Sequence, residues 1–156
     1  MAKINLPKEM LEKESFKTLP PKEKEEYVGN LLIKILQLNP NGITTSEITD
    51  ATGLTSSTIW HHLEILKSVT LSRKVSRGSV DVYYPIGSLN HVSDYDKGDA
   101  RYAVSTVENS EGKFVCIHEK RENRLGSYVT LRGMAIPFEL IDDIIFVLSK
   151  TKKSIK

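Results

Sequence analysis

Hydrophobic positions divide the chain into a helical half and a strand-rich half. Between Tyr27 and Leu38, apolar residues recur three and four positions apart, the period of a helix with one buried face. Pro21 suits the first turn of this helix, and the turn-forming residues 39–42 end it. Residues 1–20 show no clear period, so we expect an N-terminal arm that holds one short helix at most.

Capping residues predict a second, shorter helix. Thr44 and Glu47 have the spacing of a capping box, in which each side chain satisfies a free backbone N–H group. The inward residues of this helix are expected to be Ile48 and Ala51. Gly53 ends it, because glycine adopts the left-handed conformation that a tight interhelical turn requires.

A third helix is predicted from Ser56 to about Ser68. Thr55 has the residue type and position of its N-cap. The apolar residues that share one face of this helix are Ile59, Leu63 and Leu66. Leu54, in the preceding turn, is expected to fill the core beneath it.

After Leu71 the hydrophobic period changes from that of a helix to that of strands. Val75 on one side and Val80, Val82 and Tyr84 on the other fit two strands around a turn at 76–79. Residues 88–100 are polar and rich in turn-forming types, and we predict a linker there.

The second half is predicted to contain four strands and a helix. The strands are expected near residues 101–106, 114–118, 128–131 and 134–136, with connections at 109–112 and 123–126. Pro137 then opens a last helix. The apolar stripe of this helix comprises Phe138, Ile141, Ile144, Ile145 and Leu148.

Composition narrows the function classes without choosing one. The chain has 156 residues, with 22 Lys and Arg against 20 Asp and Glu, so its net charge of +2 does not by itself indicate a nucleic-acid-binding protein. No apolar run approaches the roughly 20 residues that cross a bilayer, and no secretory signal is visible. Cys116 is the only cysteine, so an intrachain disulfide is impossible. We expect a cytoplasmic protein without a membrane segment.

The order of elements from 27 to 86 carries a resemblance to known regulators. The sequences TTSEITDATGLTSSTIWHHLEILKS and LSRKVSRGSVDVYYPIG resemble the winged helix-turn-helix domains of the ArsR and MarR families of transcriptional regulators. The resemblance implies an α+β fold: an N-terminal winged helix-turn-helix, then a small antiparallel β-sheet plus a C-terminal helix. The expected domains are an arm at 1–20, the winged helix at 21–87, the linker at 88–100 and a β-sheet module at 101–156.

In such domains the helix over 56–68 is the recognition helix, whose N-terminal part reads base edges in the major groove. The contact residues that the resemblance implies are Thr55, Ser56, Ser57, Thr58, Trp60, His61 and Lys67. Trp60 either contacts DNA or packs on a neighbouring segment, whereas His62 is expected to point inward.

The hairpin after this helix corresponds to the wing. Arg73, Lys74, Arg77 and Tyr83 are the expected wing contacts, at phosphates or in the minor groove. The alternative is that these charges are only the solvated surface of a hairpin.

Residues 101–150 are similar to a second family, the positive-cofactor-four coactivators that bind single-stranded DNA. Basic and aromatic residues alternate along the strands, as stacked bases and their phosphates require. The candidate single-strand contacts are Arg101, Lys113, Phe114, Lys120, Arg121, Arg124, Tyr128 and Arg132. The alternative is a module used for dimerisation or ligand sensing.

Three hypotheses for the whole chain follow. The first is a homodimeric transcriptional regulator that binds double-stranded DNA through the winged helix. The second is a transcription-associated protein whose C-terminal half binds single-stranded DNA, and the third is a winged helix that assembles with transcription machinery. No cofactor is expected, because Cys116 and His118 form too small a ligand set for metal sensing. No catalytic motif is present, so we expect no enzyme.

Overall fold

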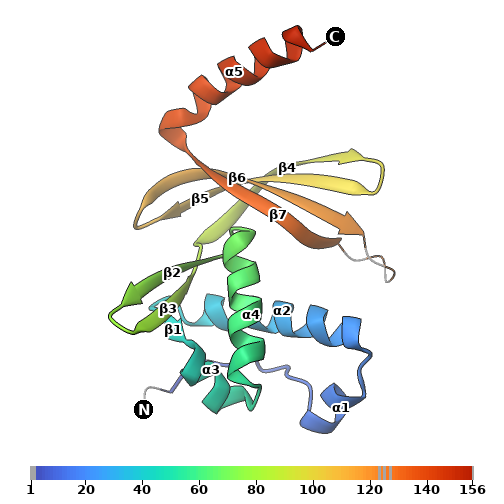
Figure 1. Ribbon diagram of the computed structural model, residues 1–156, viewed down its shortest axis with the longest axis vertical. Helices are drawn as coiled ribbons and strands as arrows, with labels where there is room; N and C mark the ends of the chain where they lie inside the picture. Colours follow the sequence, from blue (N-terminus) through green and yellow to red (C-terminus); the bar gives the residue numbers. More distant parts are fainter. Residues whose placement is uncertain (1–2, 123, 125, 127, 156) are drawn as a thin grey trace. The chain divides into compact units, whose positions relative to one another are not determined.

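The computed structural model describes residues 3–122, 124, 126 and 128–155, and they form two units that meet between Ile86 and Gly87. Figure 1 shows helices and a small sheet in the first unit, and a larger sheet followed by a helix in the second. The first sheet has the strand order β1-β3-β2 and the second the order β4-β5-β6-β7. All strand pairs are antiparallel, which confirms the predicted α+β class.

The first unit contains four helices and three short strands. In chain order they are α1 (Lys13–Thr18), α2 (Pro21–Leu38), β1 (Ile43–Thr44), α3 (Thr45–Thr52), α4 (Ser56–Ser68), β2 (Ser72–Arg77) and β3 (Val80–Pro85). Pro21 stands at the first helical position of α2, where its missing N–H group leaves no bond unmade. The helix ends at Leu38, directly before the predicted turn.

The core of the first unit forms where α2, α3 and α4 meet the small sheet. Its buried aliphatic residues come from all three helices and from β1: Val28, Leu31, Leu32, Ile35, Leu36, Ile43, Ile48, Ile59, Leu63 and Leu66. Leu54 packs against this cluster, as the sequence predicts. Ala51 differs from its prediction, because it lies on the exposed side of the short helix α3.

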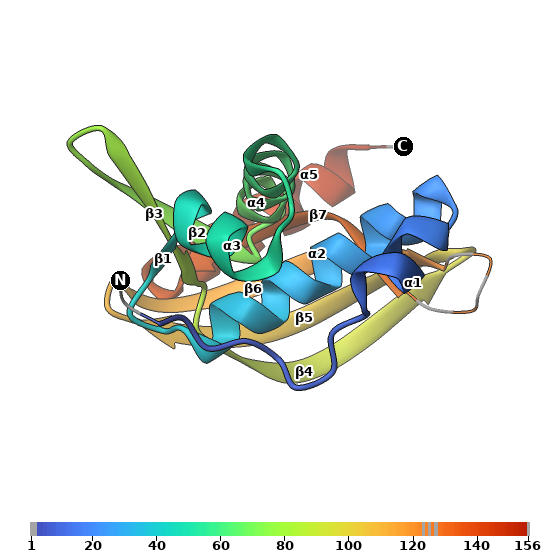
Figure 2. The same ribbon diagram turned by 90° about the horizontal axis from the view of Figure 1, so that it is seen from below.

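The N-terminal arm belongs to this unit and packs along α2 (Figure 2). Asn5 and Asn39 join the arm to the end of α2 through reciprocal hydrogen bonds, in which the Asn5 backbone N–H donates to Asn39 Oδ1 at 2.9 Å. Tyr27 holds the middle of the arm by accepting the backbone N–H of Leu11 at 2.9 Å. The helix α1 then lies against the N-terminal half of α2, where Phe16 contacts Tyr27.

The second unit is a four-stranded meander followed by a helix. Its elements are β4 (Ser88–Lys97), β5 (Ala100–Asn109), β6 (Gly112–Glu122), β7 (Tyr128–Pro137), the 3₁₀ helix η1 (Phe138–Leu140) and α5 (Ile141–Ser154). Consecutive strands pair with one another throughout. Pro137 precedes η1, so the last helical segment begins where the sequence predicts.

The structure corrects the prediction of a linker over residues 88–100. Ser88–Lys97 forms β4, which pairs with β5 along nearly its whole length. The strand lies at the edge of the sheet, and all but one of its residues are exposed, so it lacks the apolar alternation of a half-buried strand. The polar sequence after it is the β4–β5 hairpin turn, with Gly98 at φ +62°.

A second correction concerns the end of the sheet. The strands predicted near 128–131 and 134–136 are one continuous strand, β7. Its register shifts where Glu119 and Lys120 of β6 pair with Arg132 and Thr130, so Leu131 is an extra residue. This bulge interrupts the alternation and explains the division of the pattern into two. In the predicted connection at 123–126, Asn123 and Leu125 lie outside the described residues.

The helix α5 differs from the helices of the first unit in having no buried residue. Ile145, Phe146, Val147 and Leu148 are 54–69% exposed. Among the described helices, none is both long and apolar enough to cross a membrane.

Candidate nucleic-acid interface

The turn between α3 and α4 is built by the caps that the sequence predicts. Thr44 and Glu47 form a complete capping box, in which the Thr44 backbone N–H donates to Glu47 Oε2 at 2.8 Å. Gly53 has the left-handed conformation, with φ +71°, and it ends α3. Thr55 then caps α4 by accepting the backbone N–H of Thr58. These contacts fix the start of α4 relative to α3, as a helix-turn-helix requires.

The two sides of α4 have different neighbours. Ile59, Leu63 and Leu66 are buried against α2 and α3, which leaves the opposite side of the helix exposed. We call this side the exposed face of α4. By the helical period it contains Ser57, Trp60, His61 and Ser68, all of which are solvent-exposed.

Hydroxyl groups gather at the N-terminus of α4. Thr55 Oγ1 lies 2.8 Å from Thr58 Oγ1 and 3.2 Å from Ser57 Oγ. Ser56 Oγ lies 3.2 Å from Thr49 Oγ1, so it joins α4 to α3. Of the predicted contacts in this group, Thr58 is half-buried, while the other three are exposed. Small hydroxyl side chains at a helix N-terminus present donors and acceptors without obstructing a phosphate or a base edge.

The aromatic residues of α4 are separated by the helix turn. Trp60 is 52% exposed, a large value for an indole in a monomeric protein. His61 is exposed, and its ring centroid lies 5.7 Å from that of half-buried His62 in an edge-on arrangement. Burial and the adjacent His61 lower the pKa of His62. His62 therefore remains neutral more readily than His61 does near neutral pH.

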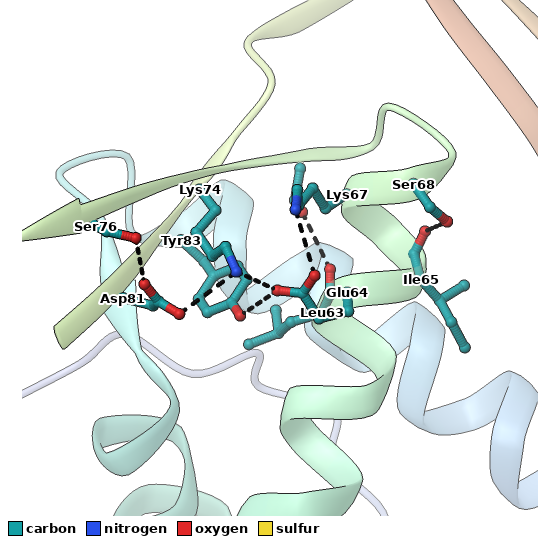
Figure 3. Close-up of polar contacts among 10 residues, drawn as sticks. Leu63, Glu64, Ile65, Lys67, Ser68, Lys74, Ser76, Asp81 and Tyr83 are labelled. Carbon is teal, nitrogen blue, oxygen red and sulfur yellow. Dashed lines mark hydrogen bonds and ion pairs between the residues drawn. The ribbon is translucent and has the colours of Figure 1, made fainter. Parts of the chain in front are cut away.

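A polar network around Glu64 joins α4 to the wing formed by β2 and β3 (Figure 3). Lys74 Nζ of β2 lies 2.8 Å from Glu64 Oε1, and Lys67 Nζ lies 3.4 Å from Glu64 Oε2. The hydroxyl of Tyr83, on β3, donates to Glu64 Oε1 at 2.8 Å. Asp81 extends the network, because it lies 3.4 Å from Lys74 Nζ and accepts a hydrogen bond from Ser76 at 2.5 Å.

This network changes the picture of two predicted contact residues. The hydrogen bond from Lys74, with those from Tyr83 and Lys67, lowers the pKa of Glu64 to about 2, so Glu64 is ionised at neutral pH. Its negative charge offsets the positive charges of Lys67 and Lys74. Sequence reasoning missed Glu64 because only the fold brings β2 to this side of α4. The available signal was the Glu64–Lys67 spacing of three, which places both side chains on one helix side.

Tyr83 departs from its expected role as a wing contact. Its side chain is fully buried, and its hydroxyl is occupied by Glu64. The alternation of β3 explains the difference, since Tyr83 lies on the sheet face that packs toward α4, while its neighbour Tyr84 lies on the other face. Tyr83 is part of the core and has no exposed surface with which to reach DNA.

The other face of the wing carries both arginines. Arg73, Arg77 and Tyr84 share this face by their register in the β2–β3 pair. The Arg73 guanidinium lies 4.7 Å from the centre of the Tyr84 ring, and Arg77 Nη2 donates to Tyr84 Oη at 3.1 Å. Arg77 is exposed and lies directly before the turn at Gly78, so its guanidinium can contact a phosphate at the wing tip.

The candidate single-strand contacts of the second unit lie on two faces of the sheet. By register, Arg101, Phe114, Lys120 and Tyr128 share one face, which we call the Arg101 face. The opposite face contains Lys113, Arg121 and Arg132. Arg124 is exposed in the connection between β6 and β7. The structure therefore brings only half of the predicted residues together on one surface.

Ion pairs hold several of these cations in place. Arg101 makes two hydrogen bonds to the carboxylate of Asp96, at 2.7 and 3.0 Å, and its guanidinium lies 4.3 Å from the centre of the Tyr128 ring. On the opposite face, Glu119 pairs with both Arg121 and Arg132 at 3.2 Å. A cation stacked on an aromatic ring occurs on the Arg101 face, the arrangement that single-stranded nucleic acid uses.

Metal ligation was considered at the histidines and at Cys116. Cys116 and His118 are buried side by side on β6, and burial raises the pKa of the thiol, which makes it a poorer ligand. Within the part of the chain that the structure describes, no three His, Cys, Asp or Glu side chains come together as a metal site would require.

Comparison with known proteins supports the assignment of the first unit. Residues 31–68 match the family model described as "Winged helix-turn-helix DNA-binding". The matched segment runs from the middle of α2 to the end of α4, and the β2–β3 hairpin follows it directly. No curated protein and no solved structure gives a significant match. The family match and the fold together support a DNA-binding role.

Proposed function

We propose that this chain is a transcriptional regulator without catalytic activity that binds double-stranded DNA as a homodimer. The observation that carries the proposal is the α3–α4 pair, in which a capped helix presents a polar, exposed face beside a two-stranded wing. The family match over residues 31–68 covers this same segment. Such a helix fits the width of the major groove, and the wing lies beside it to contact the backbone.

The proposal assigns different tasks to the two elements. Ser57, Trp60 and His61 of the exposed face of α4 contact base edges, and the hydroxyls of Thr55 and Ser56 contact phosphates. Arg77 at the wing tip contacts a phosphate or the minor groove, with Arg73 beside it. Lys67 and Lys74 contribute through the electrostatic field, since both are engaged with Glu64.

The helix α5 supports the homodimer. Its apolar residues are exposed within the chain, and a solvated stripe of this kind is unfavourable unless another surface covers it. Its first turn holds Asp142 and Asp143, and its last turn holds Lys152 and Lys153. Two copies packed antiparallel about a twofold axis would place the acids of one helix against the lysines of the other. Charge and apolar area therefore favour a second copy of this chain as the covering surface.

A specific observation also favours single-stranded DNA as a second ligand. The Arg101 guanidinium stacks on the Tyr128 ring, and Lys120 lies opposite Arg101 on the same face of the sheet. Stacking and a nearby cation are what unpaired bases and phosphates need. In this second candidate function, the sheet binds single strands and resembles the positive-cofactor-four coactivators.

The first proposal is tested by selecting duplexes from a random pool with the full chain and then comparing variants on the selected site. Ser57→Ala and His61→Ala are expected to relax sequence preference at one or two base pairs, by about 1–3 kcal/mol for a good base contact. Lys34→Ala, exposed on α2, is the matched control and leaves the preference unchanged. A chain that is folded and binds neither duplex nor single strand at low salt would support an assembly role within transcription machinery instead.

A further inference from the structure

A cavity of about 570 Å³ opens between the N-terminal arm, α2 and the turn that leads into α4. Its volume falls within the range of small-molecule sites, roughly 300–1,000 Å³. All of its lining residues belong to the first unit. Neither the DNA-contacting role of α4 nor the core of the unit accounts for an open space at this position.

The floor of the cavity is apolar and aromatic. Phe16, Tyr27, Val28, Leu31 and Leu54 contribute to it. The rings of Phe16 and Tyr27 are in contact, with centroids 5.6 Å apart, and Tyr27 is held in place by its hydrogen bond from the Leu11 backbone. A rigid aromatic floor of this kind accommodates a flat apolar group.

The charged residues that line the cavity are mostly cationic. Lys13, Lys17 and Lys24 line it together with His61 and His62, while Glu25 is the single acid among the lining residues. Lys24 Nζ lies 5.8 Å from the centre of the Phe16 ring, so a cation sits directly beside the apolar floor. Lys17 pairs with Glu14 in an exposed contact that water weakens. The charge of the site is complementary to an anion with an apolar body.

The cavity also reaches the recognition helix. Thr55, Thr58, His61 and His62 of the α4 segment contribute to its wall. Thr58, His61 and His62 are spaced three and four residues apart, so they form one stripe of the helix. His61 belongs both to this stripe and to the exposed face of α4. An occupant of the cavity therefore lies next to a residue assigned to DNA contact.

We propose that this cavity binds a small aromatic carboxylate and that the bound anion weakens the affinity for duplex DNA. The carboxylate lies near Lys24, and the ring system lies on Phe16 and Tyr27. The negative charge of the ligand is added within a Debye length of the phosphate backbone, and His61 loses freedom to adapt to a base edge. The regulatory half of this inference rests on the proposed DNA-binding function, whereas the binding site itself does not.

The test uses 1-naphthylacetate as the probe and 1-naphthylacetamide as its neutral counterpart. Calorimetric titration of the full chain without DNA is expected to give measurable binding of the acid and about tenfold weaker binding of the amide. Lys24→Gln is expected to weaken binding of the acid about tenfold and to leave the amide unchanged. Lys34→Gln, on the same helix but outside the cavity, is the control. Circular dichroism verifies that both variants fold.

A second titration measures duplex affinity with and without saturating 1-naphthylacetate. The dissociation constant for DNA is expected to rise by at least about threefold, and DNA must weaken binding of the probe by the same factor. No binding of the acid, or equal binding of acid and amide, overturns the cavity proposal and leaves the DNA proposal standing. A chain that binds the probe but no duplex overturns the proposed function and the coupling together. Independent binding of both ligands overturns the coupling.

Discussion

Glu64 is the residue through which α4 and the wing hold each other in position. Its carboxylate accepts from Lys74 and Tyr83 and lies near Lys67, so one ionised group organises contacts from α4, β2 and β3. These bonds stabilise the ionised form, and the pKa of Glu64 falls from an ordinary value of 4.5 to about 2. A lowered pKa means that the folded state gains stability above pH 4.5 and loses it as the pH falls toward 2.

Glu64→Gln is expected to lower the free energy of unfolding at pH 7 by about 1–2 kcal/mol, a value reduced for the solvent that reaches this half-buried side chain. The difference between variant and wild type is expected to shrink between pH 4.5 and pH 2, because the wild-type carboxyl then becomes protonated. Urea unfolding across this range measures it. The control is Glu14→Gln, which removes an exposed ion pair and is expected to change stability by less than about 0.5 kcal/mol. A difference that stays constant down to pH 2 would contradict the role given to the charge.

At the same scale, the sequence identifies the residue types of the site better than their surroundings. The exposure of Ser57, Trp60 and His61 follows from the apolar stripe of the helix, which the sequence displays. The burial of Tyr83 does not, because two adjacent tyrosines on a strand face opposite sides and the sequence alone leaves open which side meets α4. The engagement of Lys74 was hidden for the same reason, since its partner lies ten residues away on another element.

At the scale of elements, two glycines make the connections that place α3 and α4. Gly42, before β1, and Gly53, after α3, both have positive φ, at +93° and +71°. A Cβ atom at position 42 would lie 2.6 Å from side-chain atoms of Val82 and Tyr84, whereas at position 53 it would meet nothing within 4 Å. The two positions therefore separate backbone strain from crowding.

Gly53→Ala is expected to cost about 1–2 kcal/mol of stability, which is the strain of the left-handed conformation alone. Gly42→Ala adds the clash with β3 and is expected to cost about 1–3 kcal/mol more. Urea titration of the two variants under identical conditions gives the comparison. Equal losses would show that β3 yields to the added methyl group and that Gly42 is not required for close approach.

Elements with one buried face were predictable, and those without one were not. Capping residues and apolar stripes located α2, α3 and α4, because these helices pack on a core within their own unit. The strand β4 was missed because it is an edge strand exposed on both faces, so water does not impose an alternating pattern on it. The bulge at Leu131 divided β7 for a different reason, since an extra residue reverses the alternation.

At the scale of the whole molecule, the apolar stripe of α5 is the feature that the single chain leaves unsatisfied. Dimerisation through this helix would present two winged helices to one DNA site and raise the affinity for paired half-sites. Leu148→Asp is expected to convert a dimer at micromolar concentration into a monomer and to weaken duplex binding, as sedimentation and DNA titration measure. Ser149→Asp adds the same charge at the adjacent exposed position and is expected to leave the dimer intact. Unchanged sedimentation of Leu148→Asp would remove α5 from the interface.

The central claim, that duplex DNA is bound by α4 and the wing, is tested most directly by comparing two variants of the full chain on one selected duplex. The first combines Ser57→Ala, His61→Ala and Arg77→Ala, and the second combines Lys120→Ala with Arg121→Ala in the sheet. The first is expected to lose at least about tenfold in affinity and to show a salt dependence that is shallower by about one unit of slope, while the second keeps both values. Loss of duplex affinity in the second variant, with none in the first, would contradict the account.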